Sequence, residues 1–313
     1  MGGKILAITS GNDPHIEMVE RYLDSRIIIL DPSINPLEQQ LTYRWDGERF
    51  IIILNGSEIN DVSWVWYRKP RYPSDIPVPS QFKDVAMKYL ETHYKSLFGI
   101  LQRSRWISDP WHIFRGENKL LQMEVASSLG FNVPDTVVTN NPGEALSFRE
   151  RIGDLIVKSI APESLMIEGK VHLFYTTYIR KNEELDLSGL CVSPTIFQQV
   201  VAKTHDLRVT VVGNEVFACK IEVKGSLSEE IDWRKGIGSN DLVYSPLDLD
   251  EEISMKCVAL TSALGILFSA IDLAVDKDGK VWFLEVNPNG QWGFVEENTG
   301  LSISKAFVRL FSS

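Results

Sequence analysis

Apolar and polar positions in the first third of the chain predict strands that alternate with helices. Short apolar runs indicate buried strands at residues 4–9, 26–30, 49–54 and 62–67. Apolar residues recur at helical spacing over residues 16–23, and they recur every three or four positions over residues 82–102, which predicts a long amphipathic helix. We expect these elements to form one N-terminal α/β domain, residues 1–110.

Strands dominate the pattern in the rest of the chain. The spacing of apolar residues predicts three helices, at residues 118–129, 144–151 and 251–267. Gly130 directly after the first of them is typical of a helix C-terminus. Alternating or apolar runs predict strands at 136–139, 154–158, 170–178, 195–201, 207–212 and 216–223, followed by a hairpin of 271–275 and 280–286.

Composition narrows the class of protein. Of 313 residues, 44% are hydrophobic and 24% are charged, which is typical of a folded globular enzyme or binder. The net charge of −10 argues against a nonspecific nucleic-acid binder, because phosphate contacts need clustered Lys and Arg. Three cysteines without metal-ligand spacing favour buried thiols in a reducing compartment. No signal pattern or membrane-spanning run is found, so we expect a cytoplasmic protein with no membrane partner.

Three oxygen-bearing side chains at the predicted C-terminal hairpin suggest a metal site. Glu285 and Asn287 lie two positions apart in one strand and therefore point to one face. Asp272 can face them from the neighbouring strand. Carboxylate and amide oxygens are the ligands that Mg²⁺ prefers, with phosphates and water completing the shell. The alternative is a polar strand end beside a turn.

A second group of polar residues suggests a nucleotide site. The extended segment 195–201 can present backbone groups to an adenine edge, and Arg208 can reach a phosphate as a forked cation. A β-hairpin with solvated charges would give the same pattern. Two further cations, Lys119 at a helix start and Lys158 at a strand end, lie in apolar surroundings, although most lysines are merely solvated.

The order of these motifs resembles the ATP-grasp superfamily over residues 112–313. The resemblance implies an α/β (α+β) ATP-grasp fold: the N-terminal domain precedes two subdomains with antiparallel sheets, residues 111–190 and 191–313. It also implies ATP and Mg²⁺ as cofactors, with two ions. The residues expected to bind the nucleotide are Lys119, Lys158, Gln198, Gln199, Val200, Val201, Lys203 and Asp206. Those expected to act on the transferred phosphoryl group are Arg208 and either Lys220 or Arg234, and those expected to hold Mg²⁺ are Asp272, Glu285 and Asn287.

A narrower resemblance covers almost the whole chain. Segments 65–70, 106–111, 117–119, 132–136 and 287–292 are similar to the microviridin-type peptide maturases, also called graspetide ligases. Such enzymes activate Asp or Glu side chains of a ribosomal precursor peptide as acyl phosphates. They then join these side chains to Thr or Ser hydroxyls or to Lys amines. The resemblance implies a precursor peptide with a leader segment as partner, and a homodimer.

Two departures from the family pattern leave other functions open. Gln199 stands where many ATP-grasp enzymes carry Glu, and residues 159–169 are not glycine-rich as a phosphate-covering loop would be. An amino-acid ligase that adds glutamate to a protein or cofactor tail would share every ATP and Mg²⁺ residue. A noncatalytic ATP-binding regulator would be expected to have lost part of the metal set, which is complete here.

Overall fold

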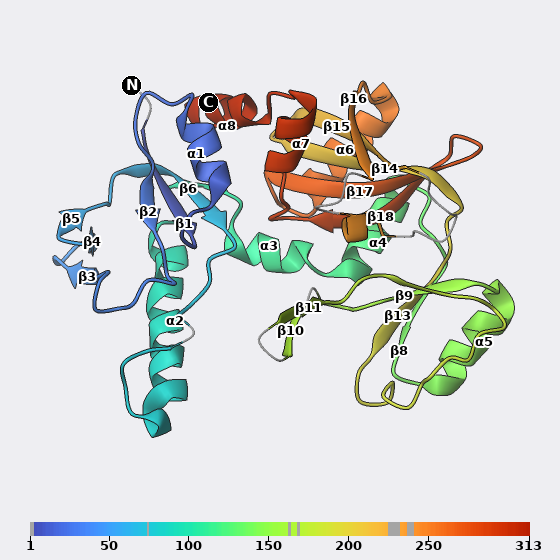
Figure 1. The fold of residues 1–313 in the computed structure, drawn as a ribbon. Coiled ribbons are helices and arrows are strands. Elements are labelled where there is room, and N and C mark those ends of the chain that lie inside the picture. The colour runs from blue at the N-terminus through green and yellow to red at the C-terminus, as the bar shows by residue number, and fades with distance from the viewer. Residues whose placement is uncertain (1–2, 74, 162–163, 168–169, 225–231, 237–240) are drawn as a thin grey trace.

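The computed structural model describes residues 3–73, 75–161, 164–167, 170–224, 232–236 and 241–313. A parallel sheet lies at the N-terminal end of the molecule, and two antiparallel sheets lie at the other end, with helix α3 (Pro110–Gly116) between them (Figure 1). In the described part of the chain, no helix is long and apolar enough to cross a lipid bilayer.

The N-terminal sheet is parallel and has the strand order β2-β1-β6-β7. Its strands are β1 (Lys4–Thr9), β2 (Ile28–Leu30), β6 (Val62–Arg68) and β7 (Arg105–Ile107), joined by helices α1 (Pro14–Glu20) and α2 (Lys83–Ile100). Successive side chains of β1 are buried on both faces, which explains why its sequence is a continuous apolar run. Tyr94, Leu97 and Phe98 of α2 pack on one face, as the helical spacing predicts.

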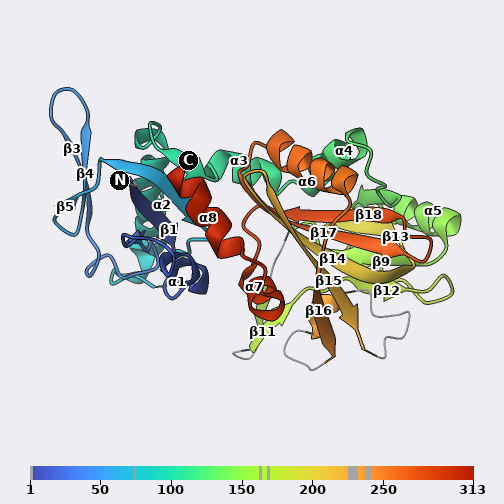
Figure 2. The same ribbon diagram turned by 90° about the horizontal axis from the view of Figure 1, so that it is seen from above.

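The predicted strand 49–54 forms, but it does not join the parallel sheet. It is strand β4 (Phe50–Leu54), which pairs with β3 (Leu41–Trp45) and β5 (Ser57–Glu58) in a separate antiparallel sheet at the far edge of the molecule (Figure 2). The apolar run of β4 did not reveal this partner, because three of the five side chains of β3 are exposed and β3 therefore contains no buried apolar run.

The end of the chain packs against its beginning. Helices α7 (Gly293–Thr299) and α8 (Ile303–Ser312) lie beside β1 and α1 (Figures 1 and 2). The ring of Phe307 lies 4.8 Å from that of Trp66, and the ring of Phe311 lies 5.7 Å from that of Trp64. One apolar core therefore joins both ends of the chain, and the division at residue 110 stays a prediction.

The middle of the chain forms a smaller sheet with the order β12-β9-β13-β8. Its strands are β8 (Thr136–Thr139), β9 (Leu155–Lys158), β12 (Thr177–Ile179) and β13 (Thr195–Gln199), with helix α5 (Pro142–Ile152) packed on it. The prediction of one strand over residues 170–178 is wrong. The structure has a hairpin of β10 (Ser164–Ile167) and β11 (Lys170–Leu173), and the chain turns before β12 pairs with β9.

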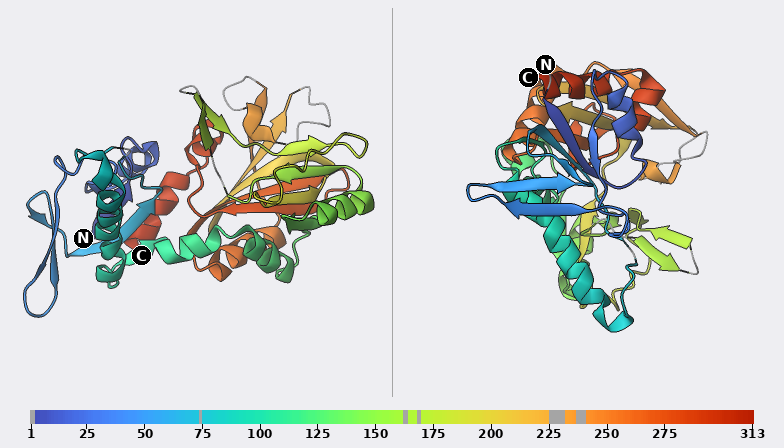
Figure 3. Two further views of the ribbon diagram at one scale, coloured as in Figure 1. Left: turned by 90° about the horizontal axis from the view of Figure 1, so that it is seen from below. Right: turned by 90° about the vertical axis from the view of Figure 1, so that its left-hand side faces the viewer.

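The C-terminal sheet is antiparallel and has the order β16-β15-β14-β17-β18. Its strands are β14 (Lys203–Val212), β15 (Glu215–Val223), β16 (Leu242–Leu247), β17 (Phe268–Asp276) and β18 (Val281–Asn287). Helices α4 (Lys119–Ser128) and α6 (Glu251–Ala263) cover one face of it (Figure 3). The predicted helix 251–267 is too long, because Gly265 adopts a left-handed φ of +78° and β17 already begins at Phe268.

Candidate active site

The register of the C-terminal sheet brings three charged side chains together on its open face. Arg208 of β14 stands opposite Asp272 of β17, which stands opposite Glu285 of β18. A one-residue bulge follows, since the next residue of β17, Leu273, pairs with Phe283. The bulge turns Phe283 into the core with Leu273 and leaves Glu285 on the open face, a re-aiming that β-bulges often perform beside active sites.

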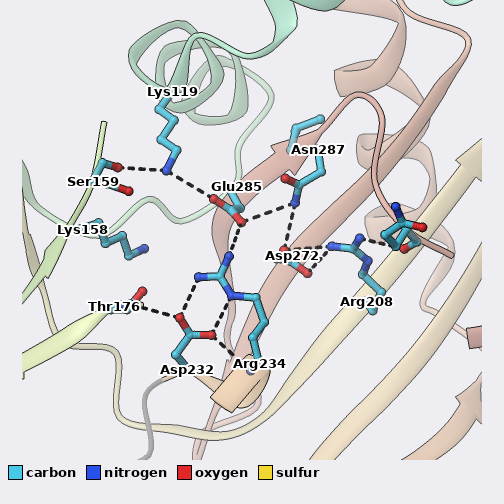
Figure 4. Close-up of polar contacts among 12 residues, drawn as sticks. Lys119, Lys158, Ser159, Thr176, Arg208, Asp232, Arg234, Asp272, Glu285 and Asn287 are labelled. Atoms are coloured by element: carbon cyan, nitrogen blue, oxygen red, sulfur yellow. Dashed lines mark hydrogen bonds and ion pairs between the residues drawn. The ribbon is translucent and has the colours of Figure 1, made fainter. Parts of the chain in front are cut away.

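Asp272, Glu285 and Asn287 meet as the sequence predicted. Nδ2 of Asn287 donates to Oδ2 of Asp272 at 3.1 Å and to Oε1 of Glu285 at 3.4 Å (Figure 4). Arg208 donates from Nη1 to both oxygens of Asp272, at 2.9 and 3.0 Å, and from Nη2 to the carbonyl of Gln291. Burial raises the pKa of Asp272, and Arg208 opposes that shift.

Three cations surround Glu285. Nζ of Lys119 lies 3.6 Å from Oε2 of Glu285, and Nη1 of Arg234 lies 3.7 Å from Oε1 (Figure 4). Burial alone would raise the pKa of Glu285, but Lys119, Arg234 and Lys158 together lower it. The desolvated surroundings of Lys158, with the other two cations nearby, lower its pKa to about 8. Glu285 is therefore a carboxylate among cations that also face an open cavity.

Arg234, and not Lys220, reaches this cluster. Its guanidinium is held by Asp232 through hydrogen bonds of 2.7 Å from Nε and Nη2, and Asp232 also accepts from the backbone N–H of Thr176 at 3.1 Å. Lys220 pairs with Glu222 and does not line the cavity. The register explains this: Lys220 stands opposite Leu207, whose side chain packs in the core on the far face of the sheet.

Gln198 and Gln199, in the extended segment 195–201 that we call the hinge, make different contacts. Gln198 accepts a 2.8 Å hydrogen bond from Nζ of Lys158 and donates to Thr136, so its side chain positions that lysine. The backbone N–H of Gln199 donates to the carbonyl of Asp135, directly before β8, and the side-chain oxygen of Gln199 accepts from the N–H of Asp135. Both side chains bind other parts of the protein, so the hinge can present its backbone groups to an adenine without a direct contact from either side chain.

Asp206 and Lys203 form a close pair beside the hinge. Nζ of Lys203 lies 2.6 Å from Oδ2 of Asp206, which is almost fully buried. Burial raises the pKa of Asp206 to about 6, although Lys203 opposes the shift. Both residues line the cavity, and a role of Asp206 near the ribose stays a prediction.

One cavity of about 700 Å³ between the two antiparallel sheets is lined by Lys119, Lys158, Gln198, Gln199, Lys203, Asp206, Arg234, Asp272, Glu285 and Asn287, whereas Arg208 lies behind Asp272 and does not line it. Its wall at the hinge is apolar and comes from Ile156, Val200, Val201, Ala274 and Leu284. The same cavity is also lined by the cations Lys119, Lys158 and Arg234, which surround Glu285, and by the oxygen donors of Asp272 and Asn287. An apolar wall, cations and hard oxygen donors in one cavity fit a purine base, its phosphates and Mg²⁺.

The cavity also contains two residues to which the sequence analysis gave no role. Lys69 follows β6 of the N-terminal sheet, and Glu117 lies between α3 and α4. Their motifs supported the resemblance, but an exposed Lys or Glu carries no spacing signal of its own. Among the cysteines, Cys219 and Cys257 are buried as expected, whereas Cys191 is exposed, which corrects the expectation of three buried thiols.

Comparison with known proteins decides the family. The profile of the RimK-like ATP-grasp domain matches residues 116–311. This chain belongs to the RimK-like ATP-grasp family. It is therefore an ATP-grasp ligase, and ATP-dependent ligation with Mg²⁺ is the chemistry of its family. A curated relative, the tetrahydromethanopterin:alpha-L-glutamate ligase of Methanocaldococcus jannaschii, is 25% identical over 216 residues, which are 68% of each chain.

Solved structures of similar ATP-grasp ligases extend the likeness to the N-terminal domain. A RiPP-associated ATP-grasp ligase from Chryseobacterium gregarium, in complex with ADP and a leader and core peptide, is 26% identical. Its TM-score is 0.87, and the match covers 100% of this chain and 97% of that one. The macrocyclase MdnB from Microcystis aeruginosa is 27% identical with a TM-score of 0.77, covering 98% of each chain. The ATP-grasp ligase has the expected α/β class with antiparallel sheets, and its fold is that of peptide-modifying relatives.

Proposed function

We propose that this ATP-grasp ligase is a peptide macrocyclase. In this proposal it activates Asp or Glu side chains of a ribosomal precursor peptide as acyl phosphates and joins them to Thr or Ser hydroxyls or to Lys amines. The observation that carries the proposal is the likeness to the Chryseobacterium ligase, which extends over the whole chain rather than over the nucleotide-binding domain alone.

The residues of the cavity have distinct tasks in the proposed reaction. Lys119 and Lys158 hold the nucleotide phosphates, and Arg234 steadies the phosphoryl group as it passes to the substrate carboxylate. Asp272, Glu285 and Asn287 would hold Mg²⁺, for which two ions are expected. When bound, the metal neutralises charge on the transferring phosphoryl group. Arg208 acts mainly by fixing Asp272 in place, because its Nη1 is fully engaged with that carboxylate.

The second half of the reaction needs no covalent enzyme nucleophile. The acyl phosphate holds a good leaving group, and a hydroxyl or amine of the same peptide attacks its carbonyl carbon. The cavity continues past Asn287 toward the N-terminal domain, where Lys69, Glu117 and Asn289 line it. This end offers room for the peptide side chains outside the nucleotide slot. A leader-binding site, a homodimer and a cytoplasmic location complete the proposal.

One comparison favours a second candidate function. The curated relative from Methanocaldococcus jannaschii is named as a glutamate ligase, so addition of a free amino acid to a protein or cofactor tail is the alternative. Such a ligase would use the same cations and oxygen ligands and would differ only in what occupies the end of the cavity beside Lys69. A noncatalytic ATP-binding regulator is less well supported, because the metal-binding side chains are all in place.

ADP release by the purified protein distinguishes these functions. The protein is mixed with Mg·ATP and either a panel of synthetic leader–core peptides, whose cores contain Thr, Lys, Asp and Glu, or a mixture of free amino acids. Peptide-dependent ADP release with loss of water from the peptide supports the macrocyclase. An acceptor that gains the mass of one amino-acid residue favours the amino-acid ligase. Nucleotide binding without turnover favours the noncatalytic regulator.

A further inference from the structure

At the end of the cavity away from the hinge, two opposite charges face each other without a bond. Among the described residues, neither the ammonium of Lys69 nor the carboxylate of Glu117 has a hydrogen bond or an ion pair within 4.0 Å, although each influences the other electrostatically. Both side chains are solvent-accessible through the cavity that also contains Asp272 and Glu285. A lysine and a glutamate kept apart beside a reaction centre leave room for a substrate between them.

The backbone holds Lys69 in an unusual conformation. Its φ is +38°, in the left-handed region that residues with a side chain rarely adopt, and it precedes Pro70. The preceding residue, Arg68, anchors the strand end from within the core, since its Nε donates to Asp13 at 2.7 Å. Strained positions of this kind persist where the surrounding structure enforces them, and they cluster at functional sites. Here the enforced conformation directs the lysine into the cavity.

Glu117 is fixed beside the metal-binding strand. The residue before it, Gly116, packs so closely on the segment after β18 that a Cβ there would lie 3.1 Å from Cγ of Pro288. Asn118, directly after it, caps α4 through hydrogen bonds to the N–H groups of Leu120 and Leu121. Glu117 is therefore held at the junction of two helices, and its carboxylate points into the same space as Lys69.

We propose that Lys69 and Glu117 form the substrate side of the active site: Lys69 binds the substrate carboxylate that becomes activated, and Glu117 takes the proton from the attacking hydroxyl or amine. This inference rests on the proposed function and assigns Lys69 to its first half and Glu117 to its second. It applies to a macrocyclase and to an amino-acid ligase alike, because both must deprotonate an acceptor.

The proposed step balances as follows. The acceptor oxygen or nitrogen forms a bond to the acyl carbon, the bond from that carbon to the phosphate oxygen breaks, and inorganic phosphate leaves with the electron pair. The acceptor proton passes to a carboxylate oxygen of Glu117 and from there to solvent through the cavity mouth. Lys69 offsets the negative charge that develops on the acyl oxygen during the attack.

The electrostatic surroundings of Glu117 suit this task. Partial burial of the Glu117 carboxyl raises its pKa, and the positive charge of Lys69 opposes that shift. The other titratable group that interacts with it is Tyr67, whose own pKa is raised by burial, by Tyr72 and by Glu117. A carboxylate with a raised pKa is a stronger base than a solvated one.

Hydroxylamine separates the two half-reactions in a test of this proposal. It attacks acyl phosphates without help from a base, so a peptide hydroxamate found by mass spectrometry reports activation, whereas ring formation reports transfer. In Glu117→Gln we expect hydroxamate at the wild-type level and ring formation lowered by about 100-fold or more. The wild-type rate of ring formation should fall as pH drops through the pKa of Glu117, and this acidic limb should disappear in the variant.

The role of Lys69 is tested in the first half-reaction, the activation of the peptide carboxylate. Lys69→Met should raise KM for the peptide and lower peptide-dependent ADP release by about 10-fold or more, while the affinity for Mg·AMPPNP stays unchanged. Lys69→Arg, which retains the charge, should restore part of the rate. Lys88→Met and Glu58→Gln, at exposed positions of α2 and β5, are the matched controls and should behave as wild type.

Different outcomes overturn different statements. Normal ring formation by Glu117→Gln, or a joint loss of hydroxamate and rings, removes Glu117 from the role of base. Unchanged peptide kinetics in Lys69→Met removes Lys69 from carboxylate binding. If the wild-type protein adds free amino acids instead of closing rings, the macrocyclase is wrong, and the same hydroxylamine comparison on that reaction still decides the role of Glu117. If it releases no ADP with any probe, both proposals fail.

Discussion

Arg208 and Asp272 form a bidentate ion pair on neighbouring strands, with Nη1 of the arginine 2.9 and 3.0 Å from the two carboxylate oxygens. Both residues are buried, with exposed fractions of 5% and 8%. Arg208 fixes Asp272, which is one of the predicted metal ligands. Its Nη2 also donates to the carbonyl of Gln291 and so holds the segment that follows β18. Function and stability therefore depend on the same contact.

Breaking this pair is expected to lower stability as well as activity. Arg208→Met should lower the free energy of unfolding by about 3–5 kcal/mol, because it leaves the Asp272 carboxylate buried and uncompensated. Adding Asp272→Asn should recover part of that loss, since no unpaired charge remains. Urea denaturation of the two single variants and the double variant measures this. Strict additivity of the two losses would show that the ion pair does not couple the residues.

Glu285 is expected to be essential for turnover but not for folding. Glu285→Gln removes a metal ligand and the counter-charge of Lys119 and Arg234, so ADP release should fall by about 100-fold or more. Mg²⁺ should also lose its effect on the thermal stability of the nucleotide complex. Glu222→Gln, which alters an ion pair outside the cavity, is the matched control and should retain both properties. A variant that releases ADP at the wild-type rate would contradict the assignment of Glu285 to the metal site.

Nucleotide binding should be accompanied by proton uptake at Lys158. The pKa of this lysine is about 8 in the free protein, so near pH 8 about half the molecules carry it uncharged. A phosphate placed beside it raises the pKa again, and about half a proton should be taken up per nucleotide. Calorimetric titration of AMPPNP in two buffers of different ionisation enthalpy measures this uptake. Lys158→Arg, which stays charged, should abolish the uptake, and uptake that persists in the variant would assign it to another group.

His15 should make the stability of the protein depend on pH. Its Nε2 accepts from the backbone N–H groups of Trp292 and Gly293, and its Nδ1 lies 2.6 Å from Asp13. Burial lowers its pKa below the ordinary 6.5, so the native state holds it neutral. Between its native pKa and 6.5 the unfolded chain binds the extra proton. The free energy of unfolding should therefore fall as pH drops below about 6.5.

A substitution of His15 tests its contact with Trp292 and Gly293, which joins the beginning of the chain to its end. His15→Phe leaves both backbone N–H groups without an acceptor and should cost about 1–3 kcal/mol at pH 8. Its stability should also lose the component of pH dependence below 6.5. His112→Gln, at an exposed position of α3, is the control. Equal pH dependence in wild type and His15→Phe would show that His15 is not the titrating group.

Several elements and the shared face of Glu285 and Asn287 could be predicted because their signals are local. The buried strands β1 and β6 and the long helix α2 follow from runs and spacings that depend only on neighbouring residues. Glu285 and Asn287 share a face for the same reason. The boundary near Gly265 was misplaced because apolar residues continue from helix α6 into strand β17, and periodicity alone cannot distinguish the two.

The sequence by itself determined the class of chemistry, because cations, hinge and oxygen ligands follow in an order that resembles one superfamily. Only the tertiary structure decided which residues share the site. It placed Lys220 on the far face of its strand and Arg234 in the cavity, it used a bulge to turn Glu285 outward, and it brought Lys69 from the N-terminal sheet beside Glu117. These relations arise from strand register and domain packing between residues far apart in the chain, and no local pattern encodes them.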